Sequence, residues 1–102
     1  MANENLRDLL LCHKGHDNPI TAREIALALG LPTRNTQFAV RQMITAVMQD
    51  HGIPICSNSR GFFVAETADE LLKYERTLIA RQRAIRKRQI LVSENFSNWC
   101  LK

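Results

Sequence analysis

Residues 21–65 have the sequence TAREIALALGLPTRNTQFAVRQMITAVMQDHGIPICSNSRGFFVA, and this stretch decides the fold. It opens with a capping box, in which the Thr21 hydroxyl accepts a hydrogen bond from the Glu24 amide while the Glu24 carboxylate accepts one from the Thr21 amide. The helix that follows is expected to be short, because Gly30 favours the left-handed conformation of a helix end and Pro32 prevents continuation. Its side chains expected in the core are those of Ile25, Ala26 and Leu29.

A longer helix is expected after this turn, capped by Thr33 or Asn35 and ending near Asp50. At about 100° per residue, its apolar and polar side chains fall on opposite sides. The inner side holds Val40, Met43, Ile44 and Val47. The outer side holds Arg34, Asn35, Phe38, Arg41, Gln42, Thr45 and Gln49. Phe38 is the apolar exception on the outer side. Contact with a thymine methyl group or a protein partner are alternatives for it, but we expect it to pack against the first helices.

A β-hairpin is expected at the end of the stretch. Residues 53–56 and 61–65 are strand-like, and residues 57–60 between them form a polar, basic tip. Pro54 lacks an amide donor, so its strand is expected at an edge. Ile20 is expected to add a short strand against this hairpin.

Two further helices are expected to flank the stretch. The first covers about residues 3–13, turns its leucines to the core and ends before Gly15. The second begins with another capping box, from Thr67 to Glu70, and runs to about Val92. Its first half is apolar enough to pack on the domain, whereas its second half is too basic to be a core helix. The apolar residues concerned are Leu6, Leu9 and Leu10 in the first helix and Leu71, Leu72, Leu78 and Ile79 in the second.

The composition is that of a single small domain with an uneven charge. The chain has 102 residues, of which 45% are hydrophobic, enough for one core. Its net charge is +4, yet residues 76–88 contain six basic side chains and no acid, which leaves −2 for the rest. Such clustering favours a polyanionic partner. A solvated helix face is the alternative explanation.

The order helix, turn, helix, hairpin is that of a winged helix-turn-helix. Residues 21–26, 29–30, 40–41, 52–57 and 61–65 together resemble this domain in small phage and prophage DNA-binding proteins, and more distantly in biotin-repressor-type regulators. The resemblance covers about residues 5–80. It implies transcriptional control or a phage DNA transaction. We expect no effector-binding or catalytic domain, unlike in the biotin regulators, so ligand sensing is not implied.

The expected fold class is therefore mainly α with a small β-hairpin: a winged helix-turn-helix with a long C-terminal helix. Residues 1–67 are expected to form the winged helix-turn-helix domain. Residues 68–102 are expected to form a basic helix and an apolar tail, packed on that domain or dimerising it. The function we expect is sequence-specific binding of double-stranded DNA. A protein-interaction module on a winged-helix scaffold and, less favoured, binding of structured RNA are the alternatives.

The candidate DNA-binding residues come from three places. In helix-turn-helix binding the second helix lies in the major groove, where arginine contacts guanine and asparagine or glutamine contacts adenine. The residues from this helix and its start are Arg34, Asn35, Thr36, Arg41, Gln42 and Thr45, of which Arg34 and Thr36 suit phosphate. The hairpin tip adds Asn58 and Arg60, and the late helix adds Arg81, Arg83, Arg86, Lys87 and Arg88. Solvation of the outer face, and of Arg60 as a turn residue, remains the alternative.

The end of the chain carries candidate oligomerisation residues. Leu71, Leu78, Ile85 and Val92 recur every seven residues. A coiled coil needs a second apolar position in each heptad, and polar residues occupy that position here, which argues against a long coiled coil. Val92, Phe96 and Trp99 form an apolar stripe that would be costly in water. A homodimer through this stripe and packing back onto the same domain are both compatible with it.

Several classes of function are not expected. No membrane span or signal peptide is recognisable, and the chain has no nucleotide-binding loop or nucleophile with a base. We therefore expect no enzyme activity, cofactor or metal. Cys12 and His13 are followed by His16, but neighbours on a helix point in different directions and no second ligand cluster is evident. The odd number of widely spaced cysteines is typical of a reducing, cytoplasmic compartment. They are Cys12, Cys56 and Cys100.

Overall fold

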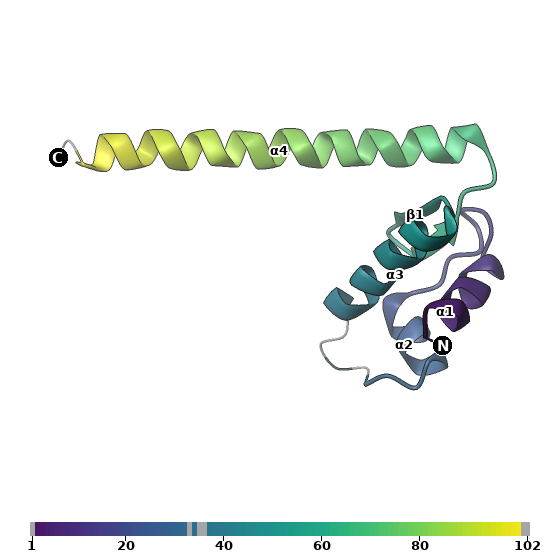
Figure 1. Ribbon diagram of the computed structural model, residues 1–102. Helices are drawn as coiled ribbons and strands as arrows, with labels where there is room; N and C mark the ends of the chain where they lie inside the picture. The colour runs from purple at the N-terminus through teal and green to yellow at the C-terminus, as the bar shows by residue number, and fades with distance from the viewer. Residues whose placement is uncertain (1, 33, 35–36, 101–102) are drawn as a thin grey trace. The chain divides into compact units, whose positions relative to one another are not determined.

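The computed structural model describes residues 2–32, 34 and 37–100, and these residues form four helices and one antiparallel hairpin (Figure 1). The chain divides into two compact units, residues 1–71 and 72–102. The class is mainly helical with a small hairpin and a long C-terminal helix, as predicted. In order the elements are α1 (Ala2–Leu11), α2 (Ala22–Ala28), α3 (Gln37–His51), β1 (Ile55–Asn58), β2 (Gly61–Val64) and α4 (Ala68–Cys100).

The capping box at the start of α2 is confirmed. The Glu24 amide donates to the Thr21 hydroxyl at 3.1 Å, and the Thr21 amide donates to the Glu24 carboxylate at 3.1 Å. These bonds satisfy two of the amides that a helix start leaves without partners. Leu29 is the C-cap, and Gly30 follows with a φ of 71°, so the glycine provides the left-handed residue that ends α2.

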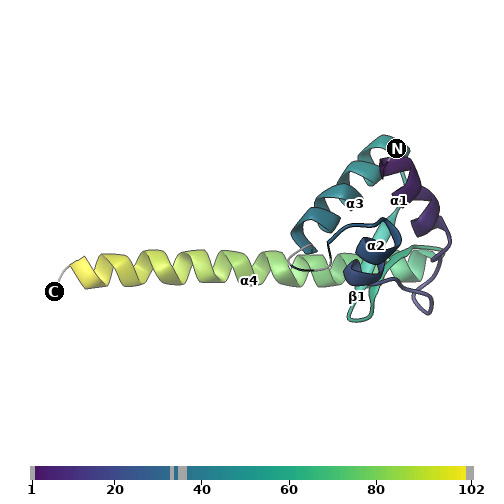
Figure 2. The ribbon, with the colours of Figure 1, turned by 90° about the horizontal axis from the view of Figure 1, so that it is seen from below.

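Three helices and the hairpin enclose the core of the first unit. Figures 1 and 2 show α1 beside α3, and both α1 and α2 contact α3. The core side chains expected in α1, α2 and α3 are confirmed, with Leu9, Leu29 and Met43 packed at its border. The first half of α4 was expected to pack as well, but Leu71, Leu72, Leu78 and Ile79 are exposed. The buried cluster consists of Leu6, Leu10, Ile20, Ile25, Ala26, Val40, Ile44, Val47, Ile55 and Val64.

The start of α3 differs from the prediction. The helix begins at Gln37, and the expected caps Thr33 and Asn35 lie outside the described residues. Its end at His51 is one residue beyond the expected end. Gly52 follows with a φ of 65°, which agrees with a glycine-terminated helix.

The first strand of the hairpin lies two residues later than predicted. β1 begins at Ile55 because Pro54 has no amide to donate, although the Pro54 carbonyl accepts a hydrogen bond from the Ala65 amide at 2.9 Å. At the other end Asn58 pairs with Gly61. Only two residues therefore form the turn, in place of the four that the sequence indicated.

The strand β2 is held from both sides. It pairs with β1 along one edge, and on the other edge the Ile20 and Phe62 amides and carbonyls exchange two hydrogen bonds of 2.8 Å. The short strand expected at Ile20 is thereby confirmed. A second, parallel β-bridge was not anticipated. It joins Lys14 to Val64, and the Val64 amide donates to the His13 carbonyl at 2.8 Å.

The last helix, α4, begins as predicted but ends later. The Glu70 amide donates to the Thr67 hydroxyl at 3.2 Å, and the Glu70 carboxylate accepts from the Thr67 amide at 3.3 Å, which confirms the second capping box. The helix continues to Cys100, so the predicted end near Val92 was wrong. The sequence from 68 to 100 contains no glycine or proline, the residues that most strongly end helices. No residue of α4 is buried.

Candidate nucleic-acid interface

The outer face of α3 is exposed as its spacing predicts. Arg41, Gln42 and Thr45 are exposed, whereas Val40 and Val47 on the other side of the helix are 0% exposed. The inner face anchors the helix in the core and so fixes which side chains point outward. α3 is therefore anchored by its inner face and presents an arginine and a glutamine to solvent.

The hydroxyl of Thr45 has a role inside the helix. It donates to the Arg41 carbonyl at 3.0 Å, one turn earlier. Thr45 therefore faces outward with a methyl group and oxygen lone pairs, but its proton is already used. It can accept a hydrogen bond from a partner more readily than it can donate one.

Phe38 does not pack in the way that we expected. Its side chain is 72% exposed, among the highest exposed fractions of the large apolar residues that the structure describes. At about 100° per residue Phe38 lies about 180° from Val47, so the geometry of α3 directs the ring away from the core. The sequence position showed the outward direction; the assumption that a phenylalanine must be covered was the error.

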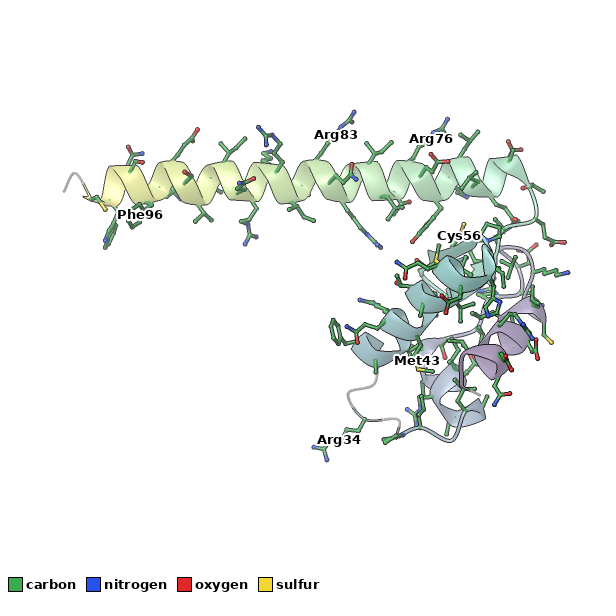
Figure 3. All side chains as sticks on the ribbon, viewed as in Figure 1. Arg34, Met43, Cys56, Arg76, Arg83 and Phe96 are labelled. Atoms are coloured by element: carbon green, nitrogen blue, oxygen red, sulfur yellow. The ribbon has the colours of Figure 1, made fainter. Side chains whose placement is uncertain are left out.

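The loop before α3 carries one described candidate. Arg34 is exposed, and Figure 3 shows its side chain projecting from the loop between α2 and α3. Asn35 and Thr36, which were predicted to contact a base and a phosphate, lie outside the described residues.

The hairpin tip separates its two candidates. The Asn58 side-chain oxygen accepts from the Arg60 amide at 2.8 Å and the Gly61 amide at 3.2 Å, while its nitrogen donates to the His16 carbonyl at 3.3 Å. Asn58 is thus largely occupied in shaping the turn. Arg60 is exposed, and no ion pair of the described residues involves it. Arg60 is the side chain of this tip that is available to a partner.

A polar cluster at the start of α4 was missed by the sequence analysis. The Glu70 carboxylate accepts from the His16 amide and contacts the His16 ring nitrogen Nδ1, both at 2.6 Å, and it also accepts from the Glu66 amide at 2.8 Å. These hydrogen bonds, led by those from the Glu66 and His16 amides, lower the pKa of Glu70 to about 2. Glu70 therefore joins the first turn of α4 to the turn at residues 15–18. His16 and Glu70 are 54 residues apart in the chain, so no local sequence pattern could have linked them.

The basic side chains of α4 do not form a single row. All six are exposed, and none takes part in an ion pair of the described residues. At about 100° per residue, three of them lie within about 40° of one another, whereas Arg81 and Arg88 lie about 140° around the helix from Arg76 and Arg83. We call the first group the basic line; it consists of Arg76, Arg83 and Lys87. Arg76 and Arg83 project from the same side of α4 in Figure 3.

The end of α4 exposes its apolar stripe. Val92 is 58% exposed, Phe96 68% and Trp99 75%. Trp99 also continues the seven-residue repeat that starts at Leu71, so five apolar residues recur at this spacing. In Figure 3 Phe96 lies on the side of α4 away from Arg76 and Arg83.

Comparison with protein-family models, with curated proteins and with solved structures finds no match to this chain. Among the described residues, none of the helices has the length and apolar character needed to cross a membrane. The same residues contain no group of three or more histidine, cysteine or acidic side chains that could hold a metal ion.

Proposed function

We propose that this chain is a winged helix-turn-helix protein that binds double-stranded DNA in a sequence-specific manner. The observation that carries the proposal is the outer face of α3, where Arg41 and Gln42 are exposed while Val40, Ile44 and Val47 of the same helix are buried. An α-helix fits the major groove, and these two side-chain types suit bidentate contacts with guanine and adenine. The resemblance of residues 21–65 to the winged helix-turn-helix of small phage and prophage DNA-binding proteins supports the same function.

In this proposal the parts of the first unit have separate roles. α3 enters the major groove with Arg41 and Gln42 on base edges. The hairpin β1–β2 acts as the wing, and Arg60 at its tip contacts a phosphate or the minor groove. Arg34 contacts the phosphate backbone next to α3. Backbone contacts set the position of the protein on the duplex, whereas base contacts provide specificity.

The basic segment of α4 supplies further phosphate contacts in this proposal. If about five phosphates are neutralised in total, the logarithm of the binding constant falls with the logarithm of salt concentration at a slope of roughly −4 to −5. The resemblance further suggests a small regulator of transcription or a factor in a phage DNA transaction, and we place it in the cytoplasm. Exposed Cys12 and Cys100, neither in a disulfide, suit a reducing compartment.

The test is selection of bound duplexes from a random DNA pool at two salt concentrations, followed by sequencing. We expect an enriched motif. Binding without enrichment would leave a nonspecific phosphate-binding protein, and no binding at low salt would remove the DNA proposal. Competition by structured RNA of matched charge separates the RNA alternative, because recognition by shape would make RNA the better competitor.

Arg41→Ala then tests the groove contact on the selected site. Loss of a bidentate contact with guanine costs roughly 1–3 kcal/mol of discrimination, so the variant should lose affinity for the selected site more than for random DNA. Arg88→Ala is the matched control, because loss of a phosphate contact should weaken both DNAs equally. Equal losses for Arg41→Ala would make this residue a backbone contact.

The exposed apolar stripe of α4 favours a second candidate function, assembly with another chain or with a second copy. A patch containing Phe96 and Trp99 is of the kind that marks protein interfaces. We expect a Phe96→Ser, Trp99→Ser double variant to be monomeric and the parent chain to show larger particles in sedimentation. Serine replacement of Ile79, 45% exposed and about 140° around the helix from Val92, is the control. If both proteins sediment as monomers, self-assembly through the stripe is excluded.

A further inference from the structure

The ring of Phe38 has no role in the proposed contacts of Arg41, Gln42 and Arg60 with DNA. It is 72% exposed, and it lies in the first turn of α3, on the midline of the outer face, with Arg41 one turn later. A phenylalanine is a poor choice for a solvated helix surface, because it exposes a large apolar ring and has lower helix propensity than the long polar residues. Nothing in the fold requires it there, since the core faces the other side of α3.

The side chains next to Phe38 on α3 indicate which kind of surface its ring would contact. Arg41 and Gln42 follow at three and four residues, the spacing that places side chains next to one another on a helix. On a helical wheel they lie on either side of Phe38, at about 60° and 40° respectively. Two side chains that suit guanine and adenine thus flank one apolar ring.

The base edges in the major groove present one apolar group that could contact the Phe38 ring. Each thymine presents its 5-methyl group there, and apolar side chains such as phenylalanine contact it. The other bases present hydrogen-bond donors and acceptors, which an exposed ring cannot satisfy. A ring flanked by Arg41 and Gln42 therefore suits a thymine methyl group better than any other group on a base edge.

We propose that Phe38 is a specificity-determining residue that contacts a thymine methyl group in the major groove. This inference rests on the proposed DNA binding and deepens it by naming a base and the atom that is recognised. The selected motif then contains a thymine next to the bases contacted by Arg41 and Gln42. A protein partner on the same ring is the competing occupant, and the experiment below distinguishes the two.

The experiment replaces each thymine of the selected duplex, one at a time, by deoxyuridine. This change removes only the methyl group and leaves all hydrogen-bonding groups of the base in place. At one thymine we expect binding of the parent chain to weaken about fourfold, which corresponds to the roughly 0.8 kcal/mol of one buried methylene-sized group. With Phe38→Ala, the thymine and deoxyuridine duplexes should bind equally at that position.

Two control variants make the result specific. Leu27→Ala removes an apolar side chain of similar exposure, 62%, from α2, and it should retain the fourfold discrimination. Phe38→Leu retains an apolar group and should retain part of it. Because Phe38 is exposed and alanine favours helices, the thermal unfolding of Phe38→Ala should remain close to that of the parent chain.

The outcomes separate this inference from the function on which it rests. If the parent chain selects a motif but no deoxyuridine weakens binding, the thymine contact is wrong while DNA binding stands. If Phe38→Ala keeps the discrimination, another residue makes the contact and the inference is overturned. If no duplex binds even at low salt, the proposed function fails first, and the exposed ring is then assigned to a protein partner.

Discussion

Replacement of Gly61 by alanine should detach the hairpin from the segment at Ile20. Gly61 has a φ of 141°, and a Cβ atom there would lie 2.5 Å from the Ile20 carbonyl oxygen and 2.7 Å from its carbon. These are backbone atoms, so the clash cannot be relieved by a side-chain rotation. Strand β2 and the segment at Ile20 would have to separate, with loss of the two 2.8 Å hydrogen bonds between Ile20 and Phe62.

The magnitude follows from two contributions. A non-glycine residue at positive φ costs roughly 1–2 kcal/mol, and two hydrogen bonds contribute about 0.5–1.5 kcal/mol each. Gly61→Ala should therefore lower the free energy of unfolding by about 2–5 kcal/mol, a large part of the 5–15 kcal/mol typical of a domain. Urea denaturation measures this loss. Hydrogen exchange should show that the amides of Ile20 and Phe62 have lost protection.

Gly30→Ala is the matched control. Gly30 also has a positive φ, 71°, but a Cβ atom there would meet nothing within 4 Å. It should lose only the backbone contribution, roughly 1–2 kcal/mol at most. If the two variants lose the same free energy, the close approach of Gly61 to Ile20 is refuted as a source of stability.

Three further predictions concern the core and the charged groups. Leu10, 0% exposed, should lose about 2–5 kcal/mol of unfolding free energy on replacement by alanine, whereas Leu72→Ala, at a side chain 49% exposed, should lose less than about 1 kcal/mol in the same assay. The pKa of Glu70 is lowered from 4.5 to about 2, so its ionised form stabilises the folded state above pH 4.5 and this contribution is lost as the pH falls towards 2. The stability difference between the parent chain and Glu70→Gln should therefore shrink over that range in acid titrations, and a constant difference would contradict the assignment. Glutamine at all three positions of the basic line should make the salt slope of DNA binding shallower by about 0.9 for each phosphate contact removed, and an unchanged slope would exclude this line from the interface.

Much of the first unit could be predicted because its signals are local. Both capping boxes depend on residues three apart, and the α3 core face depends on one helical period. Thr21 and Val47 illustrate the two cases, since each takes the role that its spacing indicated. The bridge at Ile20 was also predicted. That prediction came from the turn residues before Ile20 and from the composition of the hairpin, and no rule for strand pairing was used.

The errors concern information that a local pattern does not contain. The contact of His16 with Glu70 joins residues 54 apart, and only the folded chain brings them together. Asparagine is a residue type that contacts DNA, but the side-chain oxygen of Asn58 accepts hydrogen bonds within the turn. Phe38 was assigned to packing by residue type, although its helical position already indicated the outer face. The end of α4 was placed too early because its composition changes near Val92, while composition alone does not terminate a helix.

The helix α4 has 33 residues and none of them is buried. A substitution in its second half therefore alters no buried side chain, and the expected cost to folding is mainly the difference in helix propensity, at most about 0.7 kcal/mol for residues other than glycine and proline. Selection on this segment can act on what the helix binds with little interference from the need to fold. The first unit has the opposite constraint, since each of its ten core residues must fit the others. Among descendants of this chain, we expect the two parts to diverge at different rates, with α4 acquiring new charge patterns while α1, α2 and α3 keep theirs.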